Sequence, residues 1–334
     1  MAQRLPFVIA EIGVNHQGSF SHAKQLIQDA YHFGFDAVKL QHIDPKNIWH
    51  KSCPASFVLS EKETLPDGWI QALVSYAHSL GLQIGCTPTF QGSSSKIVES
   101  GFDFIKIASP QFKYDNFILD EALETQLPLI CSNGYSTKEE SAALISSIRS
   151  KFSTLIFSFL YCVAAYPADE IEMSDESLAF LSSVCAENDV FFGLSDHNQS
   201  LYPALKVREL YDGVVFEKHF SNSATVSLDA EVSIYDWQAQ EYVRQLKLPI
   251  TFPKKDRDAL LTDKSILFAS DFYLKRDIKA GDMFQLEDCI RLRSGLPSNF
   301  NTFNCRSLFL STPCLTYNQD LPISTRIEMR HFDI

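Results

Sequence analysis

Eight short apolar runs alternate with longer segments of helical period over the first 248 residues of the chain. In segments such as 21–33, 69–80, 93–100, 138–152, 178–186 and 201–210, apolar residues recur at intervals of three and four. This alternation is typical of repeated βα units around a parallel sheet, and eight units favour a closed (β/α)8 TIM barrel of the α/β class. The predicted strands are residues 7–12, 37–40, 83–86, 104–107, 129–131, 155–161, 190–194 and 214–216.

The pattern changes after residue 248. Residues 249–263 carry two prolines and mixed charge, and turn-rich segments such as "KAGDM" and "RSGLP" follow. We therefore expect a barrel domain over residues 1–248, a linker over 249–263, and a small, mostly β domain over 264–334.

Composition excludes several classes of partner. The net charge of −12, without a block of Lys or Arg, argues against a nucleic-acid surface or an anionic membrane. No segment approaches the roughly 20 apolar residues of a membrane span, and the N-terminus does not read as a signal peptide. We expect a cytoplasmic protein. Its eight cysteines form no CxxC pair, so reduced thiols packed as small hydrophobes are favoured over disulfides or zinc ligands.

Polar side chains follow nearly every predicted strand. Because the strands of a barrel are parallel, these side chains should converge on its C-terminal face, where such enzymes place their sites. His197 and His219 follow the last two strands, and two imidazoles on neighbouring strand ends make a metal site plausible.

The residues also resemble the sialic acid synthase family. The matching segments are "FVIAEIGVNHQGSFSHAKQLI", "DAVKLQ", "TPTF", "FIKIAS", "AYP", "FGLSDH" and "EKHF", in the family's order. The segment "SILFASDFYLKRDIKAGDMFQLEDCIRLRSGL" resembles the family's small C-terminal domain, called SAF, antifreeze-like or β-clip. The resemblance implies a transferase that condenses phosphoenolpyruvate with an open-chain N-acylated hexosamine, adds water and releases phosphate by C–O cleavage to give a nonulosonic acid.

The resemblance also implies roles for individual residues. Glu11 matches the catalytic glutamate, a base for the attacking water. His197 and His219 match the metal ligands, with Mn²⁺ the usual ion and Mg²⁺ or Co²⁺ as alternatives. Arg293 matches an arginine that reaches the partner subunit's site in a domain-swapped homodimer. The phosphoenolpyruvate positions are Lys39, Thr87, Lys106, Ser109, Ser132 and Ser195, and the sugar-acceptor positions are Gln41, Tyr166, Glu217, Asp229 and Arg293.

Nearly every departure from the family pattern falls on the acceptor side. The departures are Pro110 and Gln111 in place of "GE", Asn133 within "STG", Ala164 in place of a polar residue, and Ala230 within "PDHxxS". The donor and metal positions are mostly kept, which predicts the family's donor chemistry with a divergent acceptor. The forms "KLQ", "KIAS" and "D-x-x-x-S", the last at Asp229 to Ser233, resemble the pseudaminic acid branch of the family.

Two alternatives stay open. One is an N-acetylneuraminate or legionaminate synthase, or a spore-coat polysaccharide homologue. The other is a non-catalytic protein that binds metal and sugar in a polysaccharide pathway, which the changes at Gln111 and Ala164 motivate.

Overall fold

The computed structural model describes residues 5–48, 63–222, 229–248, 270–283, 289–293 and 316–322. The chain divides into two compact units, residues 1–250 and 251–334. The expected linker, 249–263, lies outside the described residues.

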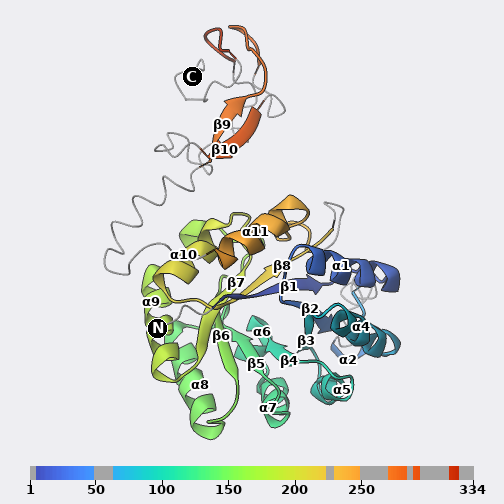
Figure 1. The fold of residues 1–334 in the computed structure, drawn as a ribbon. Coiled ribbons are helices and arrows are strands. Elements are labelled where there is room, and N and C mark those ends of the chain that lie inside the picture. The colour runs from blue at the N-terminus through green and yellow to red at the C-terminus, as the bar shows by residue number, and fades with distance from the viewer. Residues whose placement is uncertain are drawn as a thin grey trace. The chain divides into compact units, whose positions relative to one another are not determined.

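Eight parallel strands form a closed barrel in chain order, and β8 pairs with β1 to close it (Figure 1). This confirms the predicted barrel, and every predicted strand coincides with an observed one to within a few residues. The strands are β1 Phe7–Gly13, β2 Ala37–His42, β3 Gln83–Pro88, β4 Phe104–Ile107, β5 Leu129–Ser132, β6 Phe157–Cys162, β7 Phe191–Asp196 and β8 Val215–His219.

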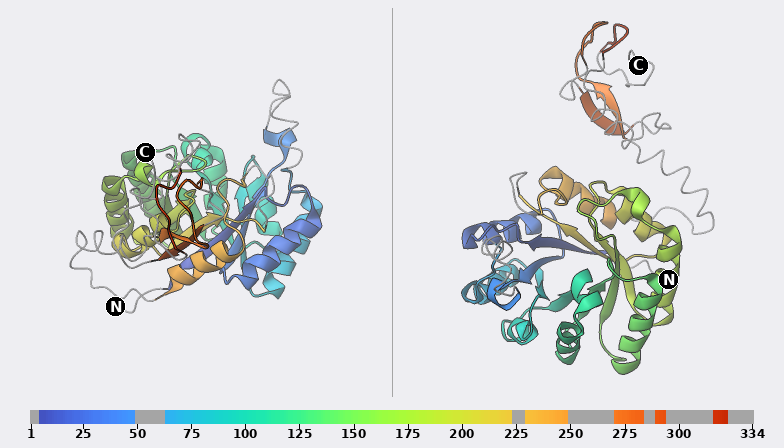
Figure 2. Two further views of the ribbon diagram at one scale, coloured as in Figure 1. Left: turned by 90° about the horizontal axis from the view of Figure 1, so that it is seen from above. Right: turned by 180° about the vertical axis from the view of Figure 1, so that it is seen from behind.

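Helices surround the outer face of the barrel (Figure 2). The helices predicted from periodicity are α1 Phe20–His32, α4 Asp67–Ser79, α5 Ser93–Glu99, α8 Lys138–Lys151, α9 Asp175–Glu187 and α10 Tyr202–Leu210. Elements beyond those predictions are α2 Pro45–Ile48, α6 Ser109–Tyr114, α7 Asn116–Glu124, the 3-10 turn Glu170–Glu172 and α11 Trp237–Lys247. No helix among the described residues is long and apolar enough to cross a membrane.

Local signals explain where these helices begin. The Ser19 hydroxyl accepts a hydrogen bond from the His22 backbone N–H at the start of α1. At α8, Thr137 and Glu140 form a reciprocal capping box. Each of these helices follows the carboxyl end of a strand, α1 after β1 and α8 after β5, at the end of the barrel where the polar side chains gather.

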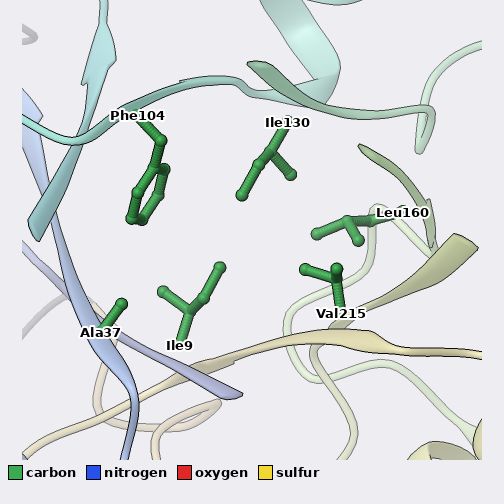
Figure 3. Close-up of a cluster of buried hydrophobic side chains, with 6 residues drawn as sticks. All are labelled: Ile9, Ala37, Phe104, Ile130, Leu160 and Val215. Carbon is green, nitrogen blue, oxygen red and sulfur yellow. The ribbon is translucent and has the colours of Figure 1, made fainter. Parts of the chain in front are cut away.

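The lower barrel interior, toward the amino ends of the strands, is an apolar layer (Figure 3). One residue from each of six strands contributes: Ile9, Ala37, Phe104, Ile130, Leu160 and Val215. The Phe104 ring occupies the space beside Gly85, where a Cβ atom would lie 2.0 Å from the ring. Alternating large and small residues fill this layer, so the barrel has a packed interior and not a pore.

The second unit contains an antiparallel pair, β9 Ser270–Leu274 and β10 Cys289–Arg293. Two isolated antiparallel bridges, Ile278 with Leu321 and Met283 with Thr316, add to it. In the barrel, Cys86, Cys131, Cys162 and Cys185 are buried free thiols. Burial raises the pKa of Cys131 to about 12, which keeps that thiol protonated, in line with the predicted role as a small hydrophobe.

Candidate active site

The polar residues of the candidate site form a second layer of inward-facing side chains, one layer closer to the carboxyl ends of the strands than the apolar cluster. Glu11, Lys39, Lys106 and Glu217 each lie two residues after a member of that cluster, on the same inward face. All four side chains are buried. The barrel therefore holds two ammonium groups and two carboxylates in its interior, directly below the strand ends.

These four groups form one ionic network. Lys39 Nζ lies 2.8 Å from Glu11 Oε2 and 3.9 Å from Glu217 Oε2. Lys106 Nζ lies 3.5 Å from Glu217 Oε1. The formal charges cancel, so each buried charge has a partner of opposite sign.

Hydroxyl groups complete the network. Lys39 donates to Thr87 Oγ1 at 2.9 Å and Lys106 donates to Ser132 Oγ at 2.8 Å. Ser109 Oγ lies 3.2 Å from Ser132 Oγ and accepts a hydrogen bond from the Gly134 backbone N–H at 2.8 Å. All six residues expected at phosphoenolpyruvate positions thus come together, the sixth being Ser195, which donates to Glu217 Oε1 at 2.9 Å.

The two carboxylates have opposite pKa shifts. Burial raises the pKa of Glu11, and the nearby Glu217 charge adds to this, while Lys39 opposes it. Burial also acts to raise the pKa of Glu217, but Lys106 and Lys39 outweigh it and lower that pKa to about 2. Two carboxyl groups whose pKa values are driven apart suit different roles: Glu217 as a fixed anion and Glu11 as a group that can exchange a proton.

Glu217 is expected at a sugar-acceptor position. Its carboxylate lies between Lys39 and Lys106 and accepts a hydrogen bond from Ser195, beside the residues expected at phosphoenolpyruvate positions. Among the other acceptor-side residues, Gln41 donates to Glu11 Oε1 at 2.6 Å. Tyr166 and Asp229 lie beside the histidines. Arg293 ends β10 in the second unit, and its side chain lies outside the part of the chain that the structure describes.

The two histidines meet at the strand ends. Their ring centroids are 5.4 Å apart, and the Tyr166 ring lies 4.2 Å from that of His197. His197 Nδ1 lies 2.8 Å from the Val163 carbonyl oxygen, which fixes the proton on Nδ1 and leaves Nε2 as a lone-pair donor. Burial lowers the pKa of His197, which favours the neutral imidazole that binds metals.

Asp229 comes from the segment after β8 and reaches the second histidine. Its Oδ2 atom lies 3.4 Å from His219 Nδ1, and that buried nitrogen has no hydrogen-bond partner among the residues that the structure describes. The segment is held by Asn15, whose amide donates to the Phe220 carbonyl and to Ser233 Oγ. Ser233 Oγ in turn donates to the Asp229 carbonyl oxygen at 2.6 Å, so Asn15 positions Asp229 through Ser233.

These contacts fit a divalent ion that takes part of its coordination from outside the protein. Within the described ranges, no set of three or more His, Cys, Asp or Glu side chains is arranged to hold a metal. Two imidazoles lie on adjacent strands, and one has a buried nitrogen that lacks a hydrogen-bond partner in the described chain. Such a pair leaves the remaining coordination positions to water or substrate oxygens.

Gly13 is a site residue that the sequence analysis did not single out. It has a φ of +50°, and a Cβ atom there would lie 2.8 Å from Asp229 Oδ2, 3.1 Å from Gln41 Nε2 and 3.1 Å from Glu11 Oε1. Glycine lets these three side chains converge above β1. Its position two residues after Glu11, at the end of a strand, was the available signal.

Two of the departures from the family pattern line a cavity of about 390 Å³ at the ends of β5 and β6. Asn133 and Ala164 both contribute to its wall, together with Cys162 and Gly134. Asn133 Oδ1 accepts a hydrogen bond from the Cys162 backbone N–H at 3.0 Å. A third changed residue, Gln111, has its Oε1 atom buried without a hydrogen-bond partner within the described segments.

Known proteins are similar to this chain in sequence. The model of the NeuB family matches residues 26–248. A pseudaminic acid synthase from Campylobacter jejuni is 28% identical over 307 residues, covering 86% of this chain and 87% of the relative. An N,N'-diacetyllegionaminic acid synthase from Legionella pneumophila is 26% identical, covering 86% and 85%.

Solved structures agree on the fold. An N-acetylneuraminic acid synthetase from Leptospira borgpetersenii superposes with a TM-score of 0.66 at 22% identity, covering 79% of this chain and 93% of that one. The spore coat polysaccharide biosynthesis protein SpsE from Bacillus subtilis gives a TM-score of 0.60 at 21% identity, covering 99% and 96%. Because the family model spans well over half of the sequence, this chain belongs to the NeuB family.

Proposed function

We propose that this protein is a nonulosonic acid synthase that condenses phosphoenolpyruvate with an open-chain N-acylated amino sugar and releases phosphate. The observation that carries the proposal is the buried pair Lys39 and Lys106, placed below two histidines at one end of the barrel. The relatives named as pseudaminic and legionaminic acid synthases support the same class of reaction.

The donor would be held by the ionic layer. Phosphoenolpyruvate carries a carboxylate and a phosphate, and an acidic protein must concentrate cations locally to bind it. Lys39 and Lys106 supply the charge, while Thr87, Ser109, Ser132 and Ser195 supply hydroxyl groups. Because Lys39 is paired with Glu11 at 2.8 Å, donor binding exchanges this ion pair for one with the substrate.

His197 and His219 would hold the metal, with Mn²⁺ as the first candidate and Mg²⁺ or Co²⁺ as alternatives. When bound, the ion supplies Lewis acidity toward a carbonyl oxygen of the acceptor. The chain's own contribution is to present two imidazoles in fixed orientation, His197 through its bond to the Val163 carbonyl.

Glu11 would act as the general base. The enol carbon of phosphoenolpyruvate attacks the aldehyde carbon of the sugar, and the carbonyl π electrons pass to the aldehyde oxygen. Water adds to the resulting oxocarbenium carbon, and Glu11 takes one proton of that water, which balances the proton that the aldehyde oxygen takes up. The tetrahedral intermediate then breaks its C–O bond to phosphate, and its hydroxyl proton leaves with the phosphate as the ketone forms. The raised pKa of Glu11 suits proton transfer near neutral pH, and Gln41, 2.6 Å away, orients the carboxylate.

The acceptor would be a sugar of the pseudaminic type. The cavity beside Asn133 and Ala164 gives room for a substituent that a larger residue at position 164 would exclude. Legionaminic, N-acetylneuraminic and spore-coat precursors are the competing acceptors, and Pro110, Gln111 and Ala230 also lie among the changed positions.

The assembly is part of the proposal. The second unit would be the SAF domain, and Arg293 would reach the partner subunit's site in a domain-swapped homodimer. The protein would act in the cytoplasm. Turnover that persists in a strictly monomeric preparation would contradict the swapped arrangement.

A phosphate-release assay on chelator-treated protein tests the function. The assay contains phosphoenolpyruvate, one metal ion at a time, and a panel of N-acylated hexosamines that includes 2,4-diacetamido-2,4,6-trideoxy sugars. We expect release that requires both the metal and one acceptor class, with loss in His219→Gln but not in the matched surface variant His78→Gln. Metal binding without any release across the panel would favour the non-catalytic reading.

A further inference from the structure

The residues beside the two histidines face away from the site. Asp196 precedes His197 at the end of β7, and Lys218 precedes His219 on β8. Strand alternation directs Asp196 and Lys218 to the outer face of the barrel wall, and both side chains are almost fully buried there. A charged pair thus lies behind the pair of imidazoles.

Lys218 contacts the backbone on both sides of His197. Its ammonium donates to the Asp196 carbonyl oxygen at 3.2 Å and also to the Asn198 carbonyl oxygen, and lies 3.7 Å from Asp196 Oδ2. Because Lys218 is covalently adjacent to His219, one ammonium group ties the backbone of one histidine to that of the other.

Further hydrogen bonds hold this arrangement. Asp196 Oδ1 accepts from the Asn198 backbone N–H at 2.9 Å, and Asp196 Oδ2 accepts from the Tyr242 hydroxyl of α11 at 3.2 Å. The His197 carbonyl oxygen accepts from the Ala168 N–H at 3.1 Å. The peptide groups on either side of His197 are therefore held by outward-facing side chains, those of Lys218 and Asp196.

We propose that Lys218 is a positioning residue that sets the spacing of His197 and His219, and thereby the affinity of the site for a divalent ion. This inference rests on the proposed function, because it assumes that the two imidazoles are metal ligands. Outer residues that orient ligands commonly change metal affinity by tenfold or more.

Arg208 offers a matched control in the same unit. It is also a buried cation that donates to backbone carbonyls, those of Gln245 at 3.1 Å and of Leu248, but it links α10 to the end of α11 and contacts neither histidine. Removal of a buried cation that has only a structural role should lower the stability of the fold and leave metal affinity unchanged.

The test measures Mn²⁺ affinity in the full-length chain from the electron paramagnetic resonance signal of free Mn²⁺. We expect Lys218→Met to weaken binding at least tenfold and Lys218→Arg to restore part of it. Arg208→Met should lower the melting temperature while leaving Mn²⁺ affinity within twofold. A folded Lys218→Met protein with unchanged affinity overturns the proposal.

A second variant and a structural comparison cover the cases in which Lys218→Met does not fold or the protein binds no metal. If Lys218→Met does not fold, the isosteric Asp196→Asn variant takes its place, with an expected loss of at least threefold, and unchanged affinity overturns the proposal. If the unaltered protein binds no Mn²⁺, Mg²⁺ or Co²⁺, the metal part of the proposed function fails. The positioning role is then judged from crystal structures, where the distance between the two histidine rings should change in Lys218→Met and stay the same in Arg208→Met.

Discussion

Two layers of the same barrel, two residues apart along each strand, contrast in their chemistry. The lower layer is apolar and contains Ile9 and Phe104, whereas the upper layer contains Glu11 and Lys106 from the same two strands. Burial of the apolar side chains of the lower layer stabilises the fold because it removes apolar surface from water. Burial of the charged side chains of the upper layer carries a desolvation cost, which the ion pairs between them offset. The lower layer therefore stabilises the barrel, and the upper layer holds the charged groups to which the proposed function assigns the anionic donor.

Loss of packing in the lower layer should lower the free energy of unfolding more than any other change considered below. Phe104→Ala removes a ring that fills the barrel beside Gly85, so we expect the free energy of unfolding to fall by roughly 3–5 kcal/mol. Urea unfolding followed by tryptophan fluorescence measures it, because all three tryptophans lie in the first unit. The exposed Phe117 serves as control, with Phe117→Ala expected to stay within about 0.5 kcal/mol. Equal losses in the two variants would contradict a packed lower layer.

The contribution of the upper layer to the free energy of unfolding should depend on pH, whereas that of the apolar lower layer should not. The pKa of Glu217 is about 2 in the folded barrel against an ordinary 4.5, so its ionised form stabilises the fold above pH 4.5, and this contribution is lost as pH falls toward 2. Glu217→Gln should therefore cost roughly 3 kcal/mol above pH 5 and progressively less below it.

The same unfolding measurement at pH 7, 5, 4 and 3 tests this dependence on Glu217. Glu241, which pairs with Arg244 on the surface of α11, gives the matched control. Glu241→Gln should change stability by less than about 1 kcal/mol throughout. A cost of Glu217→Gln that does not decline in acid would show that the carboxylate acts by shape and not by charge.

The contrast between layers also explains what the sequence could predict. The eight strands were predictable because strands buried on both faces give continuous apolar runs, as at residues 104–107 and 129–131. The short helices α6 and α7 were not, because Asp115 interrupts their period and caps α7. The convergence of polar side chains at one end of the barrel was predictable from the repeated βα pattern. The donor-side roles of these residues came only from the resemblance and stay predictions.

The position of Glu217 and the role of Gly13 were not predictable from the sequence. Both depend on which side chains meet across the barrel. Strand order alone places Glu217 on an inward face, but not between Lys39 and Lys106. The resemblance to the family identifies the positions of Glu11 and Glu217, but it does not give the contacts that shift their pKa values in opposite directions.

A third prediction separates catalysis from stability within the upper layer. Glu11→Gln should lower turnover at least 100-fold, about 2.7 kcal/mol in the barrier, because the amide cannot accept a proton from water. Phosphoenolpyruvate should bind at least as tightly, since Lys39 loses its 2.8 Å ion pair with a carboxylate. Phosphate release and isothermal titration calorimetry measure the two effects. Glu121→Gln, on α7, is the control and should change neither phosphate release nor phosphoenolpyruvate binding. Weaker phosphoenolpyruvate binding in Glu11→Gln would contradict the prediction and would place Glu11 among the groups that bind the donor.

The contribution of Ser195 distinguishes which neighbour keeps Glu217 ionised. Ser195 donates to Glu217 Oε1 at 2.9 Å, so Ser195→Ala should cost about 1.5 kcal/mol of stability at pH 7. In a Glu217→Gln background the same change should cost less than half as much, because a hydrogen bond to a neutral amide is weaker. Unfolding of the two single variants and the double variant gives the coupling. Costs that simply add would mean that Lys39 and Lys106 alone hold Glu217 ionised, and that the hydroxyl is free to serve the donor.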